Sequence, residues 1–283
     1  MKIIYFGSDS SFSLIPFLSL INSKHELSAF VYDDVNADFN VIKTDSIQAV
    51  ALKDSIPLIK VCSSHTNTVK KLQSYQADVI LVSCYARLIP ESITSTVKKG
   101  CFNLHPSLLP KFRGPIPLFW QFQQGADEFG VSIHRLSNEF DRGNIVAQEI
   151  VAIDDGVSQH EANVTLSSSA GELVLKLLND IENNCITEKV QDNKLASYQS
   201  YPEKSDFTIS TLWTAKRIFN FISAYKGQSA EFLCEVNGRN VYLVDVFSYQ
   251  EQPYENMNNQ ETVTLDNKIW LACQSGYLYA AIK

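Results

Sequence analysis

The first half of the chain alternates short apolar runs, rich in β-branched and aromatic residues, with stretches whose apolar residues recur at helical spacing. Near-continuous apolar runs are typical of strands buried on both faces of a sheet. The pattern predicts strands at 2–6, 27–32, 57–62, 79–84 and 100–105, and helices at 12–21, 47–54 and 66–75. It therefore predicts an α/β fold with a doubly wound, mostly parallel sheet, whose sites lie beyond the carboxyl ends of the strands.

In the second half of the chain, the pattern of alternating strands and helices ends with a long amphipathic helix, and short strands follow it. A short helix at 118–124 and paired strands at 130–136 and 145–153 precede that helix, which spans 158–181. A polar stretch follows, and then a helix at 212–225 and short strands at 230–236, 241–248, 263–265, 269–274 and 277–282. The Asn237-Gly238 pair between two of these strands is a hairpin signal. We expect a catalytic domain at 1–183, a linker at 184–206 and a small β-rich barrel or sandwich at 207–283.

Composition narrows the class of protein. The 283 residues are 45% hydrophobic and 19% charged, which is typical of a globular chain. The longest apolar runs, such as 77–84, are far shorter than the roughly 20 residues that span a bilayer. The N-terminus does not resemble a secretory signal, and six cysteines without a C-x-x-C pair predict reduced thiols in a cytoplasmic protein. The net charge of −7 argues against a general nucleic-acid-binding surface.

A candidate catalytic group lies where the strand at 100–105 ends. Asn103 and His105 are two positions apart, so their side chains share one face of the strand. An asparagine amide can stabilise a carbonyl oxygen that becomes negative, and a histidine can move protons near neutral pH. Asp141, in a predicted turn, could orient the imidazole. The three residues suit acyl transfer without a protein nucleophile, although each could instead be an ordinary loop or turn residue.

Other chemistries have less support. A hydrolase built on Ser107, His105 and Asp141 lacks the G-x-S-x-G elbow. A metal site from His105, His134 and Asp141 has too few ligands for structural zinc, so we expect no metal and interpret His134 as a packed or surface residue. The first strand is not followed by G-x-G-x-x-G, and the aromatic residues at 119–122 are expected in the core rather than in a stacking platform.

The segments GCFNLHPSLLPKFRGPIP and FGVSIHRLSNEFDRGNIV decide between these interpretations. With their N-x-H, S-L-L-P-x-x-R-G and D-x-G elements in this order, they resemble the folate-dependent formyltransferase family. The resemblance runs from Met1 through the long helix. It continues more weakly into the helix after 207, which looks like the entry to the C-terminal, OB-like barrel of methionyl-tRNA formyltransferases.

The resemblance implies a role for each matching residue. Asn103 would hold the formyl oxygen, His105 would assist proton transfer and Asp141 would support His105. The donor would be 10-formyltetrahydrofolate, held by the segment SCYARLIP and by the loops around Ser107 and Asp141. The implied donor-pocket residues are Tyr85, Arg87, Leu88, Ile89, Ser107, Phe140 and Gly143. Arg87 replaces a glycine-like position of the transfer-RNA enzymes and is more similar to sugar formyltransferases.

The acceptor amine stays open at this stage. The transfer-RNA enzymes carry a basic insertion after the second strand, whereas the corresponding segment 33–45 has four aspartates and one lysine. Residues 207–283 hold six Lys and Arg against seven Asp and Glu. Neither segment is typical of a phosphate-binding surface. The candidates are therefore initiator methionyl-tRNA, an amino sugar or another small amine. Two further hypotheses are a formyltetrahydrofolate hydrolase and a non-catalytic RNA-binding protein.

Overall fold

The computed structural model describes residues 1–33, 46–61, 65–252, 263–265 and 267–283. Most of the acidic segment 33–45 therefore lies outside the described residues. The chain divides into two compact units. The first comprises Met1–Pro117, Glu128–Ala152 and Asn163–Gln199, and the second comprises Leu118–Asp127, Ile153–Ala162 and Ser200–Lys283. The polar stretch at 184–206, expected as a linker, thus contributes residues up to Gln199 to the first unit.

A seven-stranded sheet forms the centre of the first unit, in the order β3-β2-β1-β4-β5-β6-β7. Its strands are β1 (Lys2–Gly7), β2 (Glu26–Tyr32), β3 (Leu58–Lys60), β4 (Val79–Ser83), β5 (Gly100–His105), β6 (Phe129–Arg135) and β7 (Ile145–Val151). The first five strands pair in parallel. Strand β6 pairs antiparallel with both of its neighbours, β5 and β7. The predicted mostly parallel sheet is confirmed. The strand order reverses between β1 and β4, which marks the edge where such folds bind ligands.

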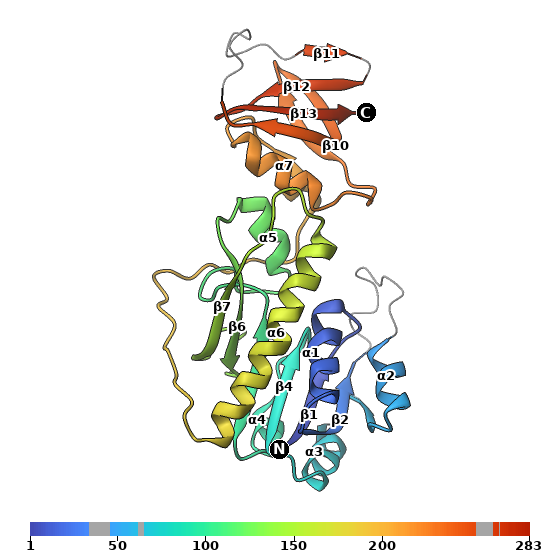
Figure 1. Ribbon diagram of the computed structural model, residues 1–283, viewed down its shortest axis with the longest axis vertical. Helices are drawn as coiled ribbons and strands as arrows, with labels where there is room; N and C mark the ends of the chain where they lie inside the picture. Colours follow the sequence, from blue (N-terminus) through green and yellow to red (C-terminus); the bar gives the residue numbers. More distant parts are fainter. Residues whose placement is uncertain (34–45, 62–64, 253–262, 266) are drawn as a thin grey trace. The chain divides into compact units, whose positions relative to one another are not determined.

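Helices pack against this sheet. They are α1 (Ser11–Ile21), α2 (Ile47–Lys53), α3 (His65–Ser74), α4 (Glu91–Thr94) and, beyond Asn163, most of α6 (Gln159–Glu182). The Ser10 hydroxyl accepts a hydrogen bond from the Ser13 amide and so caps α1. Figure 1 shows α1 and α6 side by side, and a Cβ at Gly171 would lie 2.4 Å from Ser19 Oγ. Glycine therefore lets the two helices approach closely.

Successive side chains of β1 point to opposite faces of the sheet and so contribute to two apolar layers. Ile4 and Phe6 point into a cluster that includes Leu72 of α3 and Ile93 of α4. Tyr5 points to the other face, where aromatic rings of α1 and β2 pack against it edge to face or tilted. The near-continuous apolar strands thus reflect burial on both faces, as expected. The described cysteines, at 84, 101, 185, 234 and 273, are free thiols, and Cys62 lies outside the described residues.

The second unit holds a six-stranded mixed sheet in the order β11-β12-β13-β10-β9-β8. Its elements are α5 (Pro117–Gln124), the 3-10 helix η1 (Lys204–Phe207), β8 (Thr208–Ile209), α7 (Ala215–Ser223), β9 (Phe232–Val236), β10 (Arg239–Gln250), β11 (Val263–Leu265), β12 (Lys268–Ala272) and β13 (Tyr277–Ile282). The helix expected from 212 begins only at Ala215, because Thr214 caps it. Phe119 packs against Phe207 and Phe221, which confirms its predicted core position. No helix in the described ranges is long and apolar enough to cross a membrane.

Candidate active site

Strand β5 places the two predicted catalytic side chains on one face of the sheet. Asn103 and His105 lie near its carboxyl end, and β6 pairs antiparallel with it. The register sets His134 opposite Asn103 and Ser132 opposite His105. Directly opposed side chains of an antiparallel pair lie on the same face. Four polar side chains therefore converge at this edge of the sheet.

Asp141 reaches the same place from the turn between β6 and β7. Its backbone is left-handed, with φ of 56°, a conformation that aspartate tolerates better than most residues. A Cβ at Gly143 would lie 1.8 Å from the Arg135 carbonyl oxygen, so only glycine fits the close approach of the turn to β6. Asp141 Oδ1 lies 3.4 Å from Asn103 Nδ2 and 3.6 Å from His105 Nδ1. The structure thus brings together the three residues predicted to be catalytic.

The proton positions on His105 follow from its neighbours. His105 Nε2 lies 2.9 Å from the Phe112 carbonyl oxygen, which can only accept, so Nε2 carries a hydrogen. In a neutral ring, Nδ1 is then unprotonated and faces Asp141. Burial lowers the pKa of His105, while Asp141 and the Phe112 carbonyl oppose that effect. The separation from Asp141, longer than a hydrogen bond, agrees with a neutral imidazole that becomes an ion pair when Nδ1 takes up a proton.

The Asp141 carboxylate is strongly held in its ionised form. Burial by itself raises its pKa, but the positive charge that His105 can carry and the hydrogen bond from the Gly114 amide outweigh burial. Together they hold the pKa of Asp141 below its usual range. The Gly114 amide donates to Oδ2 at 2.9 Å. Asp141 is therefore a fixed negative charge beside His105 throughout the neutral range.

The proline-rich loop after β5 is organised by its own polar groups. Ser107 is fully buried, and its hydroxyl donates to the Lys111 carbonyl oxygen at 2.9 Å. Ser132 donates to the Ser107 carbonyl at 2.6 Å and accepts from the Leu109 amide at 3.0 Å. The Ser107 hydroxyl is engaged inside the loop, so it serves there as a structural group and does not face His105 as a nucleophile would.

Apart from Ser107, the predicted donor-pocket residues lie on two segments, the loop after β4 and the Asp141 turn. In the loop after β4, Arg87 pairs with Asp33 at 3.0 Å and Leu88 is 48% exposed. Tyr85 and Ile89 instead pack against the apolar cluster of the sheet, and burial raises the pKa of Tyr85 to about 12. Beside Asp141, Phe140 is 42% exposed. Two apolar side chains at these segments are thus accessible to a ligand, and two of the predicted residues support the core.

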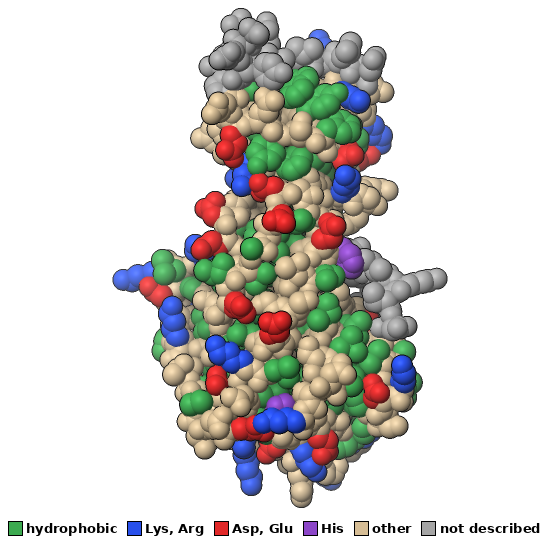
Figure 2. Space-filling view, viewed as in Figure 1, with side chains coloured by type: hydrophobic (Ala, Val, Ile, Leu, Met, Phe, Trp, Pro, Cys, Tyr) green, Lys and Arg blue, Asp and Glu red, His purple; other side chains and the backbone are tan. Residues whose placement is uncertain are grey.

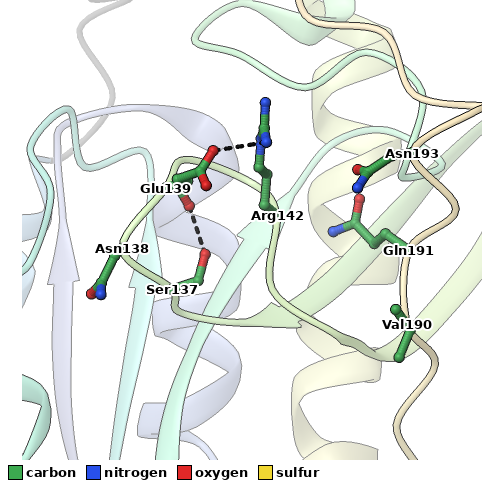
Figure 3. A pocket seen from close by; sticks show the side chains of 7 residues that line it. All are labelled: Ser137, Asn138, Glu139, Arg142, Val190, Gln191 and Asn193. Atoms are coloured by element: carbon green, nitrogen blue, oxygen red, sulfur yellow. Dashed lines mark hydrogen bonds and ion pairs between the residues drawn. The ribbon is translucent and has the colours of Figure 1, made fainter.

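The chain after α6 braces the Asp141 turn. Gln191 donates to the carbonyl oxygens of Asp141 and Gly143, at 2.8 and 2.7 Å. Its own oxygen accepts from the buried Arg113 guanidinium at 2.7 Å, and Asn193 accepts from the same guanidinium at 3.2 Å. Figure 3 shows both amides projecting from one segment. They lie beside a polar hollow of about 310 Å³. The hollow is lined by Ser137, Asn138, Glu139, Arg142, Val190, Gln191 and Asn193.

We expect Gln191→Ala to lower the free energy of unfolding by about 1–3 kcal/mol, because two carbonyls and a buried guanidinium lose their partner. Urea unfolding measures this change. Gln73→Ala on the exposed face of α3 is the matched control and should stay within about 0.5 kcal/mol of the parent. Equal stabilities of the two variants would show that the turn does not depend on this brace.

Two residues of the site were missed by the sequence analysis. His134 is buried and lies in the site, rather than merely packed in the sheet, and Gln191 belongs to the stretch expected as a linker. The alternation of Ser132 and His134 along β6 carried a usable signal, since it places both on one face. In the described ranges, no group of three or more His, Cys, Asp or Glu is placed to hold a metal ion.

An amide donor, an imidazole and a carboxylate lie together at the carboxyl edge of a parallel sheet, a combination that suits acyl transfer. The chain belongs to the formyl transferase family, whose model matches residues 1–178. The methionyl-tRNA formyltransferase of Fusobacterium nucleatum is 31% identical over 225 residues, which are 78% of this chain and 72% of that protein. The chain is thus a formyl-transferring enzyme.

Solved structures share the fold. The sugar 3N-formyl transferase WlaRD has a TM-score of 0.70 at 19% identity, and the match covers 100% of this chain and 97% of that one. HypX from Aquifex aeolicus has a TM-score of 0.59 at 18% identity. That match covers 99% of this chain and 43% of HypX, so HypX contains a large part that has no counterpart here.

Proposed function

We propose that the protein transfers a formyl group from 10-formyltetrahydrofolate to a primary amine. The convergence of Asn103, His105 and Asp141 at the end of β5 carries the proposal. Asn103 donates to the formyl oxygen as the amine nitrogen bonds to the formyl carbon. The bond from that carbon to the folate nitrogen then breaks. The amine loses a proton and the leaving folate nitrogen gains one. His105 balances this exchange by taking up a proton at Nδ1, beside Asp141, and releasing the one at Nε2, which must first leave the Phe112 carbonyl.

The residues present fit such a donor. Leu88 and Phe140 expose apolar side chains on the two segments that the family resemblance implies for the folate ring. Arg87, which precedes Leu88 in the chain and is 47% exposed at its side chain, pairs with Asp33. The WlaRD structure was determined with 5-N-formyl-tetrahydrofolate, which supports a folate donor for the shared fold.

We propose an amino sugar as the acceptor, with methionyl-tRNA as the competing candidate. Residues 33–45 and 207–283 are both net acidic, and Figure 2 shows Lys and Arg interspersed with Asp and Glu over the visible face. Transfer-RNA binding requires clustered cations. WlaRD, named as a sugar formyl transferase and solved with dTDP, matches over the full length of this chain. The identity to methionyl-tRNA formyltransferases supports the shared donor chemistry as much as a shared acceptor.

The test measures tetrahydrofolate release from 10-formyltetrahydrofolate with a nucleotide-linked amino sugar, with charged initiator transfer RNA, or with no amine. We expect release that depends on the amino sugar. Release with transfer RNA, together with binding that weakens steeply with salt, would reassign the acceptor. Release without any amine would favour the hydrolase, and no release under any condition would contradict the proposed activity.

Two predictions extend this proposal. We propose that residues 207–283 form an OB-like barrel built from the mixed sheet and that the enzyme acts in the cytoplasm. A crystal structure in which β8 and β11 remain open edges would contradict the barrel.

A further inference from the structure

His134 occupies a position from which it can control Asn103. The two residues are directly opposed in the β5–β6 pair, and His134 is only 1% exposed. His134 Nε2 lies 3.1 Å from Asn103 Nδ2 and 3.4 Å from Asp141 Oδ1. Its ring also lies edge to face with His105, with 6.4 Å between ring centres. Because His134 contacts all three predicted catalytic side chains, its role is not limited to packing in the core.

The backbone sets the tautomer of this ring. His134 Nδ1 lies 2.8 Å from the Arg135 carbonyl oxygen. Because a carbonyl oxygen only accepts, Nδ1 must carry the hydrogen. A neutral imidazole has one protonated nitrogen, so Nε2 is left with a lone pair. That lone pair faces the Asn103 amide.

The Asn103 amide can then have only one orientation. Its nitrogen faces two acceptors, His134 Nε2 and Asp141 Oδ1, at 3.1 and 3.4 Å. Rotating the amide by half a turn would place its oxygen against both of them. We infer that His134 is a positioning residue, which as the Nδ1–H tautomer holds the Asn103 amide with its NH2 group facing the acceptors.

The same triangle leaves one N–H available. The three distances between Asn103 Nδ2, His134 Nε2 and Asp141 Oδ1 are 3.1, 3.4 and 3.4 Å, so the two acceptors subtend about 60° at the amide nitrogen. This is half the angle between the two N–H bonds of a planar amide. The two N–H bonds therefore cannot both be aligned with these acceptors, which leaves one N–H for a further acceptor. In the reaction proposed above, on which this step rests, the second N–H meets the formyl oxygen.

A nuclear magnetic resonance experiment tests the inference without using activity. Long-range ¹H–¹⁵N correlation on the intact, ¹⁵N-labelled protein distinguishes the two tautomers of His134. We expect Nδ1 to be protonated and Nε2 unprotonated. In Asn103→Ala, the Nε2 resonance should move toward that of an unprotonated nitrogen without a donor. An Nε2–H tautomer, or an Nε2 chemical shift that is the same in the parent and in Asn103→Ala, would overturn the inference.

Kinetics then test the consequence for turnover. His134→Leu should lower kcat by about 10- to 100-fold, less than the loss of the Asn103 donor itself, with KM for the donor unchanged. His134→Gln, whose amide oxygen can lie near the Nε2 position, should recover most of that loss. His160→Leu, at an exposed position, is the matched control and should match the parent. Equal losses in the Leu and Gln variants would overturn the positioning role. Absence of turnover in the parent protein would instead reject the proposed function, and the tautomer experiment would still decide the inference.

Discussion

Replacing Asn103 with alanine is expected to lower kcat for formyl transfer by about 100- to 1,000-fold, with little change in the KM of the donor. The amide N–H stabilises charge that develops on the formyl oxygen only as the new bond forms. Losing it therefore raises the barrier and leaves ground-state binding nearly intact. Steady-state kinetics on the purified variant, with the acceptor found active in the release assay, measure both constants.

The stability of this variant separates chemistry from folding. Asn103 is only partly buried, and its side chain bonds to His134 and Asp141 without supporting the apolar core. Asn179→Ala on the exposed side of α6 serves as the control, with kcat expected within twofold of the parent. A variant at Asn103 that keeps normal kcat and raises only KM would show that the amide binds substrate and does not act in the transition state.

The sequence was sufficient for features that depend on local pattern. The run at 79–82 is apolar at every position because β4 is buried on both faces, and such runs predict a covered parallel sheet. Asn103 and His105 were found because residues two apart on a strand must share a face. The Ser10 cap of α1 is equally local, since capping depends on a few consecutive residues.

Other features depend on register and tertiary contacts that no local pattern specifies. His134 belongs to the site only because β6 pairs with β5 in the register that sets it opposite Asn103. Gln191 looked like part of a polar linker, and its function appears only when the chain returns 50 residues later to the Asp141 turn. The side-chain amides of Gln191 and Asn193 accept the hydrogen bonds of the buried Arg113 guanidinium, where a carboxylate is the usual partner. No local pattern in the sequence predicts these partners.

Asp141→Asn is expected to lower kcat by at least about 100-fold, because it removes the charge that supports proton transfer by His105. An asparagine keeps an oxygen that can accept from the Gly114 amide, so the turn can persist. Burial already lowers the pKa of His105, and the Asp141 carboxylate opposes this. Without the carboxylate, the His105 pKa falls further. The ¹⁵N titration of His105 should therefore move to lower pH in the variant, in parallel with the loss of kcat.

The pH dependence of stability tests the same carboxylate independently of turnover. The folded-state pKa of Asp141 lies below its unfolded value near 4, so the interactions of the ionised form stabilise the protein fully above that value. They are lost only as pH falls through the lower folded-state pKa. Above about pH 7, where His105 is neutral in parent and variant, the difference in unfolding free energy between parent and Asp141→Asn should thus stay constant. Uptake of a proton by His105, which the carboxylate favours in the parent, should widen the difference at lower pH, and protonation of Asp141 should narrow it again below about pH 4. Urea unfolding across that range measures it. A difference that does not change in acid, or a His105 titration that does not move, would mean that Asp141 is not the charge that His105 depends on.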